Sequence, residues 1–407
     1  MASKRQVFAW CLYDFANSSF ATIILTVAYG VFFKETICGG GGRGDFFWGL
    51  SLSLAYGFAA IAAPILGALS DETGSRKKFL MIMTLLCIFS TALLYFLEAG
   101  MVLTGMILFI LGFFGFAVGN VFYNSFLLDI SNSKTVGRIS GFGWALGYLG
   151  GLATLGLFYP WISTNRLRIS FLLTALFFLI FSLPIFIFFK SRQIPSRESF
   201  YNSLKKSFHS IRQTRREIAD HKELIKFLIA YFFYNDGLST VITFSSLYAH
   251  STLQMTMQEI TVLFFFLQIT AFIGAFISGF FVDRFGAKKT ILGTLSIWIF
   301  TVLGTYYVQT KTGFLIISLI AGLGLGSAQS ASRSFVALET PISKVGEFFG
   351  FFAIFTKFSS ILGPLFFGLA SHLLQSQRKA ILTVLAFFIV GACLLFRVRE
   401  KEITENS

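Results

Sequence analysis

Four charged residues lie inside long apolar stretches of the chain: Asp14, Asp236, Arg333 and Lys357. A charge at the centre of a membrane helix costs about 2.5–3.5 kcal/mol on insertion scales, so it normally faces a cavity or a partner. A guanidinium presents a planar fork that matches a carboxylate, and a desolvated carboxylate can hold an ammonium group or a coupling proton. These residues therefore predict binding of a zwitterion, such as an amino acid or small peptide. The alternative is that they pair with one another as ion pairs that close a gate.

Uncharged polar and aromatic residues in the apolar stretches are further candidates for lining a pocket. Aligning the two halves of the chain sets Arg333 opposite Tyr123 and Lys357 opposite Tyr148, so only the second half supplies buried positive charge. This asymmetry favours an anionic group docking on the second half. Ordinary packing, or a hydrogen bond back to the same helix, is the alternative for each residue. The uncharged candidates for binding substrate or a coupling ion are Asn17, Tyr123, Asn124, Tyr148 and Gln329.

A short pattern of small, acidic and basic residues occurs twice, each time between two apolar stretches. In each copy a glycine precedes an aspartate by four residues, and a second glycine and a basic cluster follow. Glycine lets neighbouring membrane helices approach closely, while the aspartate is suited to cap a helix N-terminus and to pair with nearby bases. The residues are Gly67, Asp71, Gly74, Arg76 and Lys77 in the first copy and Gly279, Asp283, Arg284, Gly286 and Lys288 in the second.

These two loops are expected to stabilise one conformation of a gate. Asp129 and Glu339, at the inner ends of the fourth and tenth apolar spans, are expected to pair with the basic clusters of the first and second loop. For any single lysine or arginine, the alternative is that it only marks the cytoplasmic side of the membrane.

Other features repeat with similar offsets. Tyr13-Asp14 recurs as Tyr234-Asn235-Asp236, and the segment 137–141 recurs as 346–350. Two related membrane halves are typical of transporters that work by alternating access.

The composition fixes the class of protein. It is 55% hydrophobic and 13% charged with a mean hydropathy of +0.75, which is typical of an integral membrane protein. A helical span needs about 20 apolar residues. Twelve such spans are predicted, in an all-α polytopic fold of two pseudo-symmetric six-helix bundles at 1–189 and 225–407, joined by a basic linker at 190–224. The spans are 7–33, 46–70, 79–98, 102–128, 139–160, 169–189, 225–249, 258–282, 290–308, 313–337, 347–373 and 379–396.

The net charge of +14 reflects membrane sidedness. Most Lys and Arg fall on one flank of the predicted spans, which places both termini in the cytoplasm and argues against a nucleic-acid partner. Residues 200–218 of the linker are either a basic amphipathic helix on the membrane surface or a flexible connector. The chain is expected to be a monomer in a bacterial inner membrane. Its four cysteines imply no disulfide framework.

Motifs of catalysis and of primary pumps are absent from the sequence. It contains neither a GxxxxGK[ST] loop nor HExxH, and its histidines are scattered. An enzyme, an ATP-driven pump and a metal or other cofactor are therefore not expected.

The doubled Gly67/Asp71/Gly74 and Gly279/Asp283/Gly286 loops on a chain of two six-span halves resemble the major facilitator superfamily. The segments 13–18, 123–127, 141–151, 329–334 and 347–350 resemble its vacuolar-effluxer-like branch, whose yeast members are associated with export of amino acids. The resemblance implies a secondary transporter of small solutes. Together with the buried charges, it favours amino acids or related zwitterionic or anionic metabolites as substrates, with a proton at Asp14 or Asp236 as the candidate coupling ion. Many aromatic residues and a glycine-rich fifth span leave a second hypothesis open, which is efflux of amphipathic drugs or lipid-like molecules.

Overall fold

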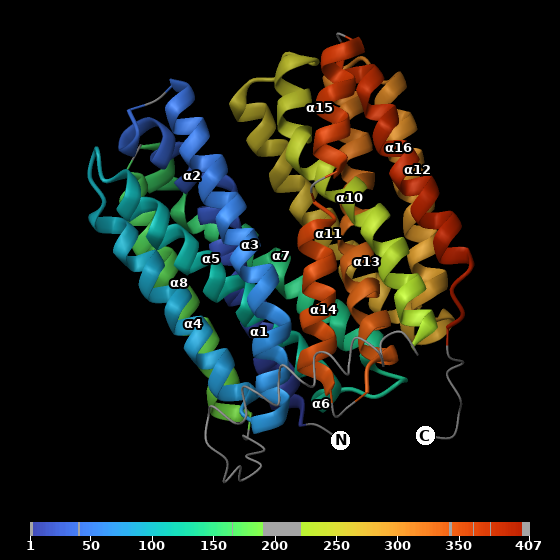
Figure 1. Cartoon of the computed structure of the whole chain (residues 1–407). Coiled ribbons are helices and arrows are strands. Elements are labelled where there is room, and N and C mark those ends of the chain that lie inside the picture. Colours follow the sequence, from blue (N-terminus) through green and yellow to red (C-terminus); the bar gives the residue numbers. More distant parts are fainter. Residues whose placement is uncertain are drawn as a thin grey trace. The chain divides into compact units, whose positions relative to one another are not determined.

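A computed structural model describes residues 3–39, 41–164, 166–189, 221–341, 344–360, 362–374 and 376–400. These residues form helices and contain no strand (Figure 1). The predicted amphipathic helix at 200–218 lies outside the described residues.

The chain forms two compact units. Unit 1 comprises Met1–Ile130, Leu146–Arg212 and Pro341–Phe351, and unit 2 comprises Ser131–Ala145, Gln213–Thr340 and Phe352–Ser407. Each unit therefore contains a short segment from the other half of the sequence. The predicted bundle limits at 189 and 225 stay a prediction.

The helices of the first half of the sequence are α1 Lys4–Ser19, η1 Phe20–Val27, α2 Tyr29–Phe32, η2 Phe33–Ile37, α3 Gly41–Thr73, α4 Arg76–Leu93, η3 Leu94–Phe96, α5 Val102–Ser125, α6 Leu127–Ile130, α7 Val136–Ser163 and α8 Leu167–Phe188. Those of the second half are α10 Lys222–Ser251, α11 Met257–Phe285, α12 Ala287–Tyr307, α13 Lys311–Glu339, α14 Val345–Phe358, α15 Leu362–Leu374 and α16 Gln377–Phe396. Helix α7 begins in unit 2 and ends in unit 1, and α14 begins in unit 1 and ends in unit 2.

Among the described residues, ten helical segments are long and apolar enough to cross a membrane. Two predicted spans are not among these ten segments. The seventh corresponds to α10, which is 30 residues long and carries Asn235 and Asp236 in its interior. The predicted eleventh span, 347–373, is not one helix, because it divides into α14 and α15.

The first span is also irregular. The α-helical geometry of α1 ends at Ser19, and residues Phe20–Val27 continue as a π-helix. Two hydroxyls just before the change donate to backbone carbonyls of their own helix, Ser18 to Asp14 and Ser19 to Ala16. Such bonds compete with the helical ladder, and π-helical turns occur frequently at functional sites. The sequence pattern predicts the span but not this change.

Polar caps begin several helices in unit 2. Thr256 and Glu259 form a capping box at α11, and the side chains of Thr310 and Ser376 cap α13 and α16. Helix α11 ends at Phe285 and is followed by the cap residue Gly286, whose φ of 90° favours a residue without a side chain.

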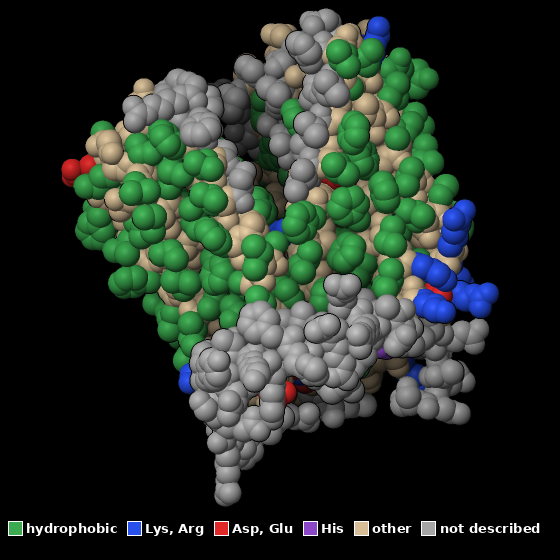
Figure 2. Space-filling model, in the orientation of Figure 1, with side chains coloured by type: hydrophobic (Ala, Val, Ile, Leu, Met, Phe, Trp, Pro, Cys, Tyr) green, Lys and Arg blue, Asp and Glu red, His purple; other side chains and the backbone are tan. Residues whose placement is uncertain are grey.

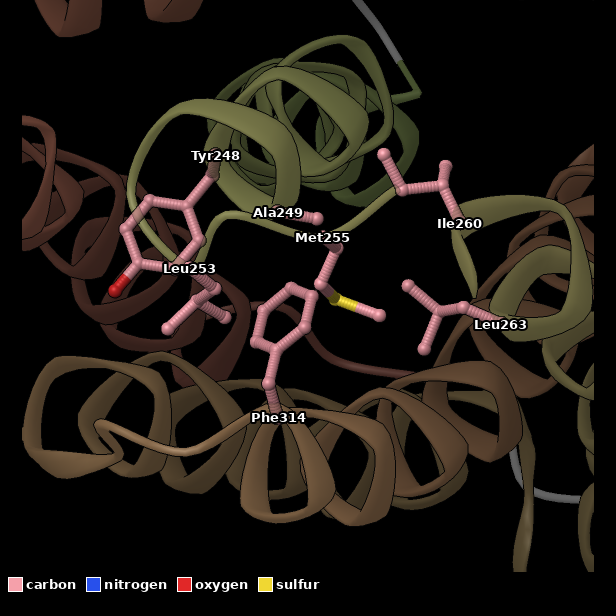
Figure 3. Close-up of a cluster of buried hydrophobic side chains, with 7 residues drawn as sticks. All are labelled: Tyr248, Ala249, Leu253, Met255, Ile260, Leu263 and Phe314. Carbon is pink, nitrogen blue, oxygen red and sulfur yellow. The ribbon is translucent and has the colours of Figure 1, made fainter. Parts of the chain in front are cut away.

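Apolar side chains fill the interior and also cover the sides of the helices. One buried cluster in unit 2 joins α10, α11 and α13 and includes Tyr248, Met255 and Phe314 (Figure 3). Exposed residues such as Ile61, Leu103 and Tyr307 lie on the outside of helices. On the face in Figure 2 hydrophobic side chains cover the described helices, whereas Lys and Arg gather near the end of α16 that leads to the C-terminus. This distribution suits helices surrounded by lipid.

Candidate functional site

The carboxylate of the first loop lies at the N-terminus of α14. Asp71, in the last turn of α3, accepts a hydrogen bond from the backbone N–H of Glu347 at 3.0 Å and one from Arg76 Nε at 2.9 Å. A second arginine nitrogen lies 3.7 Å from Asp129. Asp71 thus holds the positive end of α14 while Arg76 joins two carboxylates, which is the pairing with Asp129 that the sequence predicts.

A glycine makes this approach possible. A Cβ on Gly67 would lie 2.3 Å from the carbonyl oxygen of Gly346, at the beginning of α14. Since backbone atoms cannot yield to a side chain at that distance, the two helices touch there through backbone alone.

The second loop has the same design with different partners. Asp283, near the end of α11, accepts hydrogen bonds from the backbone N–H of Gly137 at 2.8 Å and that of Arg138 at 3.2 Å. It also accepts one from Arg138 Nε at 2.7 Å. All three donors belong to the first turn of α7, so this carboxylate caps α7 and pairs with its first arginine.

Glycines again bring the helices together. A Cβ on Gly279 would lie 2.8 Å from the carbonyl oxygen of Gly137, and one on Gly141 would lie 2.6 Å from that of Ala275. Helices α7 and α11 therefore pack backbone to backbone next to Asp283.

Two lysines of the loops bind backbone carbonyls at the C-terminal ends of helices α8 and α16. Lys77 Nζ donates to the carbonyl oxygen of Phe189 at 2.7 Å, just beyond α8. Lys288 Nζ donates to the carbonyl oxygen of Phe396 at 3.0 Å and to that of Val398. Arg284 is exposed, with its guanidinium 5.2 Å from the ring centre of Phe285. The predicted partner of the second basic cluster, Glu339, is buried.

Glu400 caps the helix that follows the second loop. Its two carboxylate oxygens accept from the backbone N–H of Ala287 at 2.6 Å and from that of Lys288 at 3.0 Å. Burial raises the pKa of this carboxyl above its ordinary value, although the two N–H donors act in the opposite direction. A Cβ on Gly286 would lie 2.5 Å from Glu400 Oε2. That oxygen ends a side chain that can shift, so the φ of 90° is the stronger reason for glycine at this position.

Three of the predicted binding residues gather in unit 1. Asp14 and Asn17 are buried on α1, and Asn17 donates to the side-chain oxygen of Asn120 at 3.1 Å. A Cβ on Gly147 would lie 3.7 Å from Asp14 Cγ, which brings α7 and the neighbouring, half-buried Tyr148 beside α1. Asn124 is half-buried on the last turn of α5.

Tyr123 belongs to an aromatic stack in the same unit. Its ring lies 4.6 Å from that of Trp10 and 5.0 Å from that of Tyr13, and its carbonyl oxygen accepts from Trp10 Nε1 at 2.9 Å. Packing therefore accounts for the position of the Tyr123 ring.

Arg333 is buried in unit 2, with 3% of its surface exposed. Its guanidinium donates to Ser140 Oγ at 3.0 Å and to the carbonyl oxygen of Ser140, and it lies 5.2 Å from the ring centre of Trp144. These contacts join α13 to the first turns of α7. Gln329, one turn earlier on α13, is half-buried.

Asp236 and Lys357 lie on elements of unit 2 that adjoin the break in the eleventh span. Asp236 is fully buried on α10 and accepts from the backbone N–H of Gly363 at 2.8 Å. Lys357 is half-buried near the end of α14. Asp236 forms no ion pair with Lys357 or Arg333 in the described part of the chain.

A family model described as "Vacuole effluxer Atg22 like" matches residues 47–136 and 128–406. The chain belongs to this family.

The effluxer-like chain is similar along its whole length to a bacterial transporter. It is 29% identical to the "Uncharacterized MFS-type transporter YxiO" of Bacillus subtilis (strain 168), over 99% of this chain and 97% of the relative. It is 26% identical to "Autophagy-related protein 22" of Kluyveromyces lactis, over 69% of this chain and 60% of the relative.

Solved structures show the fold. A proton:xylose symporter, XylE, superposes with a TM-score of 0.73 at 14% identity and covers 97% of this chain and 95% of that chain. The human organic anion transporter MFSD10 gives a TM-score of 0.77 at 15% identity, with coverage of 96% and 99%. The effluxer-like protein is thus a multi-pass membrane protein with the major facilitator fold, a secondary transporter and not an enzyme.

Sequence reasoning missed three functional contacts of this effluxer-like chain: those of Arg138, Ser140 and Glu400. The repeat of 137–141 at 346–350 could have indicated some of these contacts, because each copy lies at the start of a helix that an aspartate caps. Glu400 left no such signal, since it follows the last span and has no counterpart in the repeat.

Proposed function

We propose that this protein moves amino acids, or related zwitterionic or anionic metabolites, across the membrane by alternating access. The observation that carries the proposal is the presence of a fully buried acid, Asp236, and a buried base, Arg333, on membrane helices. Burial of such groups is expensive unless they serve a function. The proposed substrate is a small molecule that offers a carboxylate, an ammonium group or both.

Arg333 would bind the substrate carboxylate. In this structure its guanidinium is bonded to Ser140 on α7. A carboxylate that takes the place of these acceptors would form a stronger, charge-assisted pair, and it would release α7 from α13. Substrate binding and the opening of a gate would then be one event, in which the carboxylate replaces the hydrogen bonds between Arg333 and Ser140.

The acidic residues would bind the ammonium group or carry a coupling proton. Asp14 lies beside Asn17 and Tyr148, and Asp236 lies on α10. Lys357, Tyr123, Asn124 and Gln329 stay candidates for the pocket.

The two loops would stabilise one conformation of the transporter. Asp71 and Asp283 each hold the N-terminus of a helix, and these bonds must break if that helix moves during transport. The proposed setting is a bacterial inner membrane, with a monomeric chain whose two termini are cytoplasmic. Its support is the distribution of Lys and Arg along the sequence.

Reconstitution into liposomes tests this function. Labelled amino acids are screened for flux with and without a proton gradient, using Arg333→Ala, Arg333→Lys and Ser140→Ala proteins. If Arg333 binds a carboxylate, Arg333→Ala abolishes flux, and Arg333→Lys raises KM because lysine lacks the planar fork. Ser140→Ala is the matched control, since it weakens the α7 contact and keeps the guanidinium.

Two results would contradict the proposal. One is normal flux in Arg333→Ala. The other is absence of flux for every amino acid together with thermal stabilisation of the detergent-solubilised protein by hydrophobic compounds. That second result would favour the efflux of amphipathic drugs or lipid-like molecules.

A further inference from the structure

The eleventh span is interrupted beside a row of polar side chains on α10. Helix α14 ends at Phe358 and α15 begins at Leu362. Non-helical backbone inside a membrane protein is tolerated where other protein groups satisfy it. In transporters, discontinuous helices commonly adjoin sites for substrates and coupling ions.

A row of α10 side chains contacts the residues around this break. Asn235 Nδ2 donates to Ser359 Oγ at 2.6 Å, and the hydroxyls of Ser239 and Ser360 lie 2.9 Å apart. One turn before them, the hydroxyl of Tyr231 lies 3.2 Å from that of Thr356. The break is therefore built into unit 2 by specific hydrogen bonds.

Asp236 holds the second half of the broken span. Its Oδ1 accepts from the backbone N–H of Gly363, in the first turn of α15. The contact is close, because a Cβ on Gly363 would lie 2.0 Å from Thr240 Oγ1 and 2.9 Å from Asp236 Oδ1. The carboxylate thus caps the N-terminus of a 13-residue helix, where negative charge is favoured.

The second carboxylate oxygen is buried without a partner. Asp236 has 0% of its surface exposed. The backbone N–H of Leu362 also lies near the carboxylate, but Oδ2 makes no well-formed hydrogen bond with the described residues. The elements next to α10 carry these Asp, Glu, Lys, Arg and His residues: Glu259, Asp283 and Arg284 on α11, Lys311, Arg333 and Glu339 on α13, Glu347 and Lys357 on α14, His372 on α15, and Arg378 and Lys379 on α16. None of those whose side chains are described pairs with Asp236.

We propose that Asp236 Oδ2 is a proton-binding site, and that its protonation releases the clamp between α10 and α15. The idea that this protonation is coupled to transport rests on the proposed function. The proton comes from water and forms an O–H bond on Oδ2, which leaves the carboxyl group neutral. The attraction between a negative charge and the N-terminus of α15 is then lost, while Oδ1 still accepts one hydrogen bond.

The chemistry of the site favours a proton over a metal ion. Sodium and similar cations require several oxygen ligands, whereas the groups that converge on Asp236 from α15 are N–H donors at the positive end of a helix. Among the described residues, Asp236 Oδ2 is the one carboxylate oxygen at this break that is buried without a hydrogen-bond partner. A covalently bound proton needs no further ligands.

Infrared difference spectroscopy of the full-length protein in liposomes, recorded over a pH series, tests the protonation step. The wild type should show the carbonyl band of a buried carboxylic acid that grows as pH falls, and Asp236→Asn should lack it. Asp283→Asn is the matched control, because it removes another carboxylate that caps a helix in the same unit. Asp236→Glu keeps a carboxyl group at this position and should keep a band that changes with pH. Such a band would show that a substitution at this position does not by itself misfold the protein, so the loss of the band in Asp236→Asn reports the loss of the carboxyl group.

Hydrogen exchange of residues 359–374 tests the release of the clamp. After correction for the intrinsic rate, exchange at the start of α15 should increase on the order of tenfold at low pH in the wild type. Asp236→Asn should exchange rapidly at every pH, and Asp283→Asn should behave as the wild type does.

Three outcomes overturn the inference: a band that Asp236→Asn retains, exchange of α15 that does not depend on pH, or exchange that responds to sodium and not to pH. Neither assay uses a transported substrate. Failure of amino-acid flux would therefore leave this inference standing, and failure of the titration would leave the proposed function standing.

Discussion

The two repeated loops share glycine and aspartate spacing but neutralise their aspartates differently. In the first loop Asp71 binds Arg76, which belongs to the loop itself. In the second loop Asp283 binds Arg138, which belongs to the helix that the aspartate caps. The position that follows the first glycine of the capped helix is Arg138 in α7 and Glu347 in α14. An acid at this position in α14 explains why the first loop must supply its own arginine.

The difference shows which part of the design is common to both loops. Both retain a carboxylate at a helix N-terminus and a glycine contact between backbones. The ion pair is interchangeable, since its cation comes from a different element in each loop. Capping and close packing should therefore contribute more to stability than the ion pairs do.

The largest effect is expected from the glycines. Gly67→Ala places a Cβ 2.3 Å from a backbone oxygen, whereas Gly279→Ala places one at 2.8 Å. Overpacking costs typically about 1–3 kcal/mol, so Gly67→Ala should lie at the upper end and Gly279→Ala at the lower end. Thermal unfolding in detergent measures both. Gly57→Ala is the control on α3, because its Cβ meets open space; equal destabilisation by all three would contradict the packing argument.

The aspartates should rank next. Asp283→Asn loses charge-assisted bonds from three donors and should cost about 2 kcal/mol. Asp71→Asn should cost about 1 kcal/mol, because the helix start that Asp71 caps carries a buried acid, Glu347, whose charge opposes that of Asp71. Denaturation in detergent compares them with Glu98→Gln, which changes an exposed acid. A larger loss for Asp71→Asn would mean that its ion pair outweighs its helix cap.

The arginine that pairs with each aspartate should contribute differently to stability in the two loops. The side chain of Arg76 is 17% exposed, and that of Arg138 is 43% exposed. Solvent screens the second pair more, so Arg76→Ala should cost about 1 kcal/mol and Arg138→Ala at most about 0.5 kcal/mol. Added salt should reduce both differences. Lys78→Ala and Lys289→Ala are matched controls at exposed positions beside each loop, and a reversed order of the two arginines would refute the screening argument.

The smallest effect on stability is expected from Glu400, which caps the helix after the second loop. The first loop has no equivalent contact, because the side chain of Ser75 does not cap α4. The pKa of Glu400 is raised by burial. Its stabilising contribution is thus complete below the unfolded pKa of about 4.3 and is lost as pH rises through the folded pKa. The unfolding free energy of the wild type should fall relative to Glu400→Gln over that range, by less than about 0.5 kcal/mol.

Melting curves of the wild type and Glu400→Gln at a series of pH values measure this difference. A difference that grows in the opposite direction would show that the N–H donors of α12 outweigh burial. A constant difference would show that Glu400 does not titrate over this range.

Part of the site was predictable because it repeats. The doubled loops predict two capped helices and identify Asp71, Asp283 and the neighbouring glycines, and the structure shows carboxylates at helix N-termini in both places. The partner of Asp283 was not predictable, because Arg138 is far from it in sequence. The proposed binding residues were selected as expensive buried charges, whereas the contact of Arg333 with Ser140 depends on how α7 packs on α13.

By itself, the sequence determined that this chain is an all-helical membrane protein of two related halves, because apolar length and repeated motifs are local properties. Only the tertiary structure decided where helical geometry changes. The π-helical segment Phe20–Val27 and the break between α14 and α15 lie in stretches that read as ordinary spans. At the break, hydroxyl, amide and carboxylate groups on α10 replace hydrogen bonds that a continuous helix would have made, and their position depends on packing between distant segments.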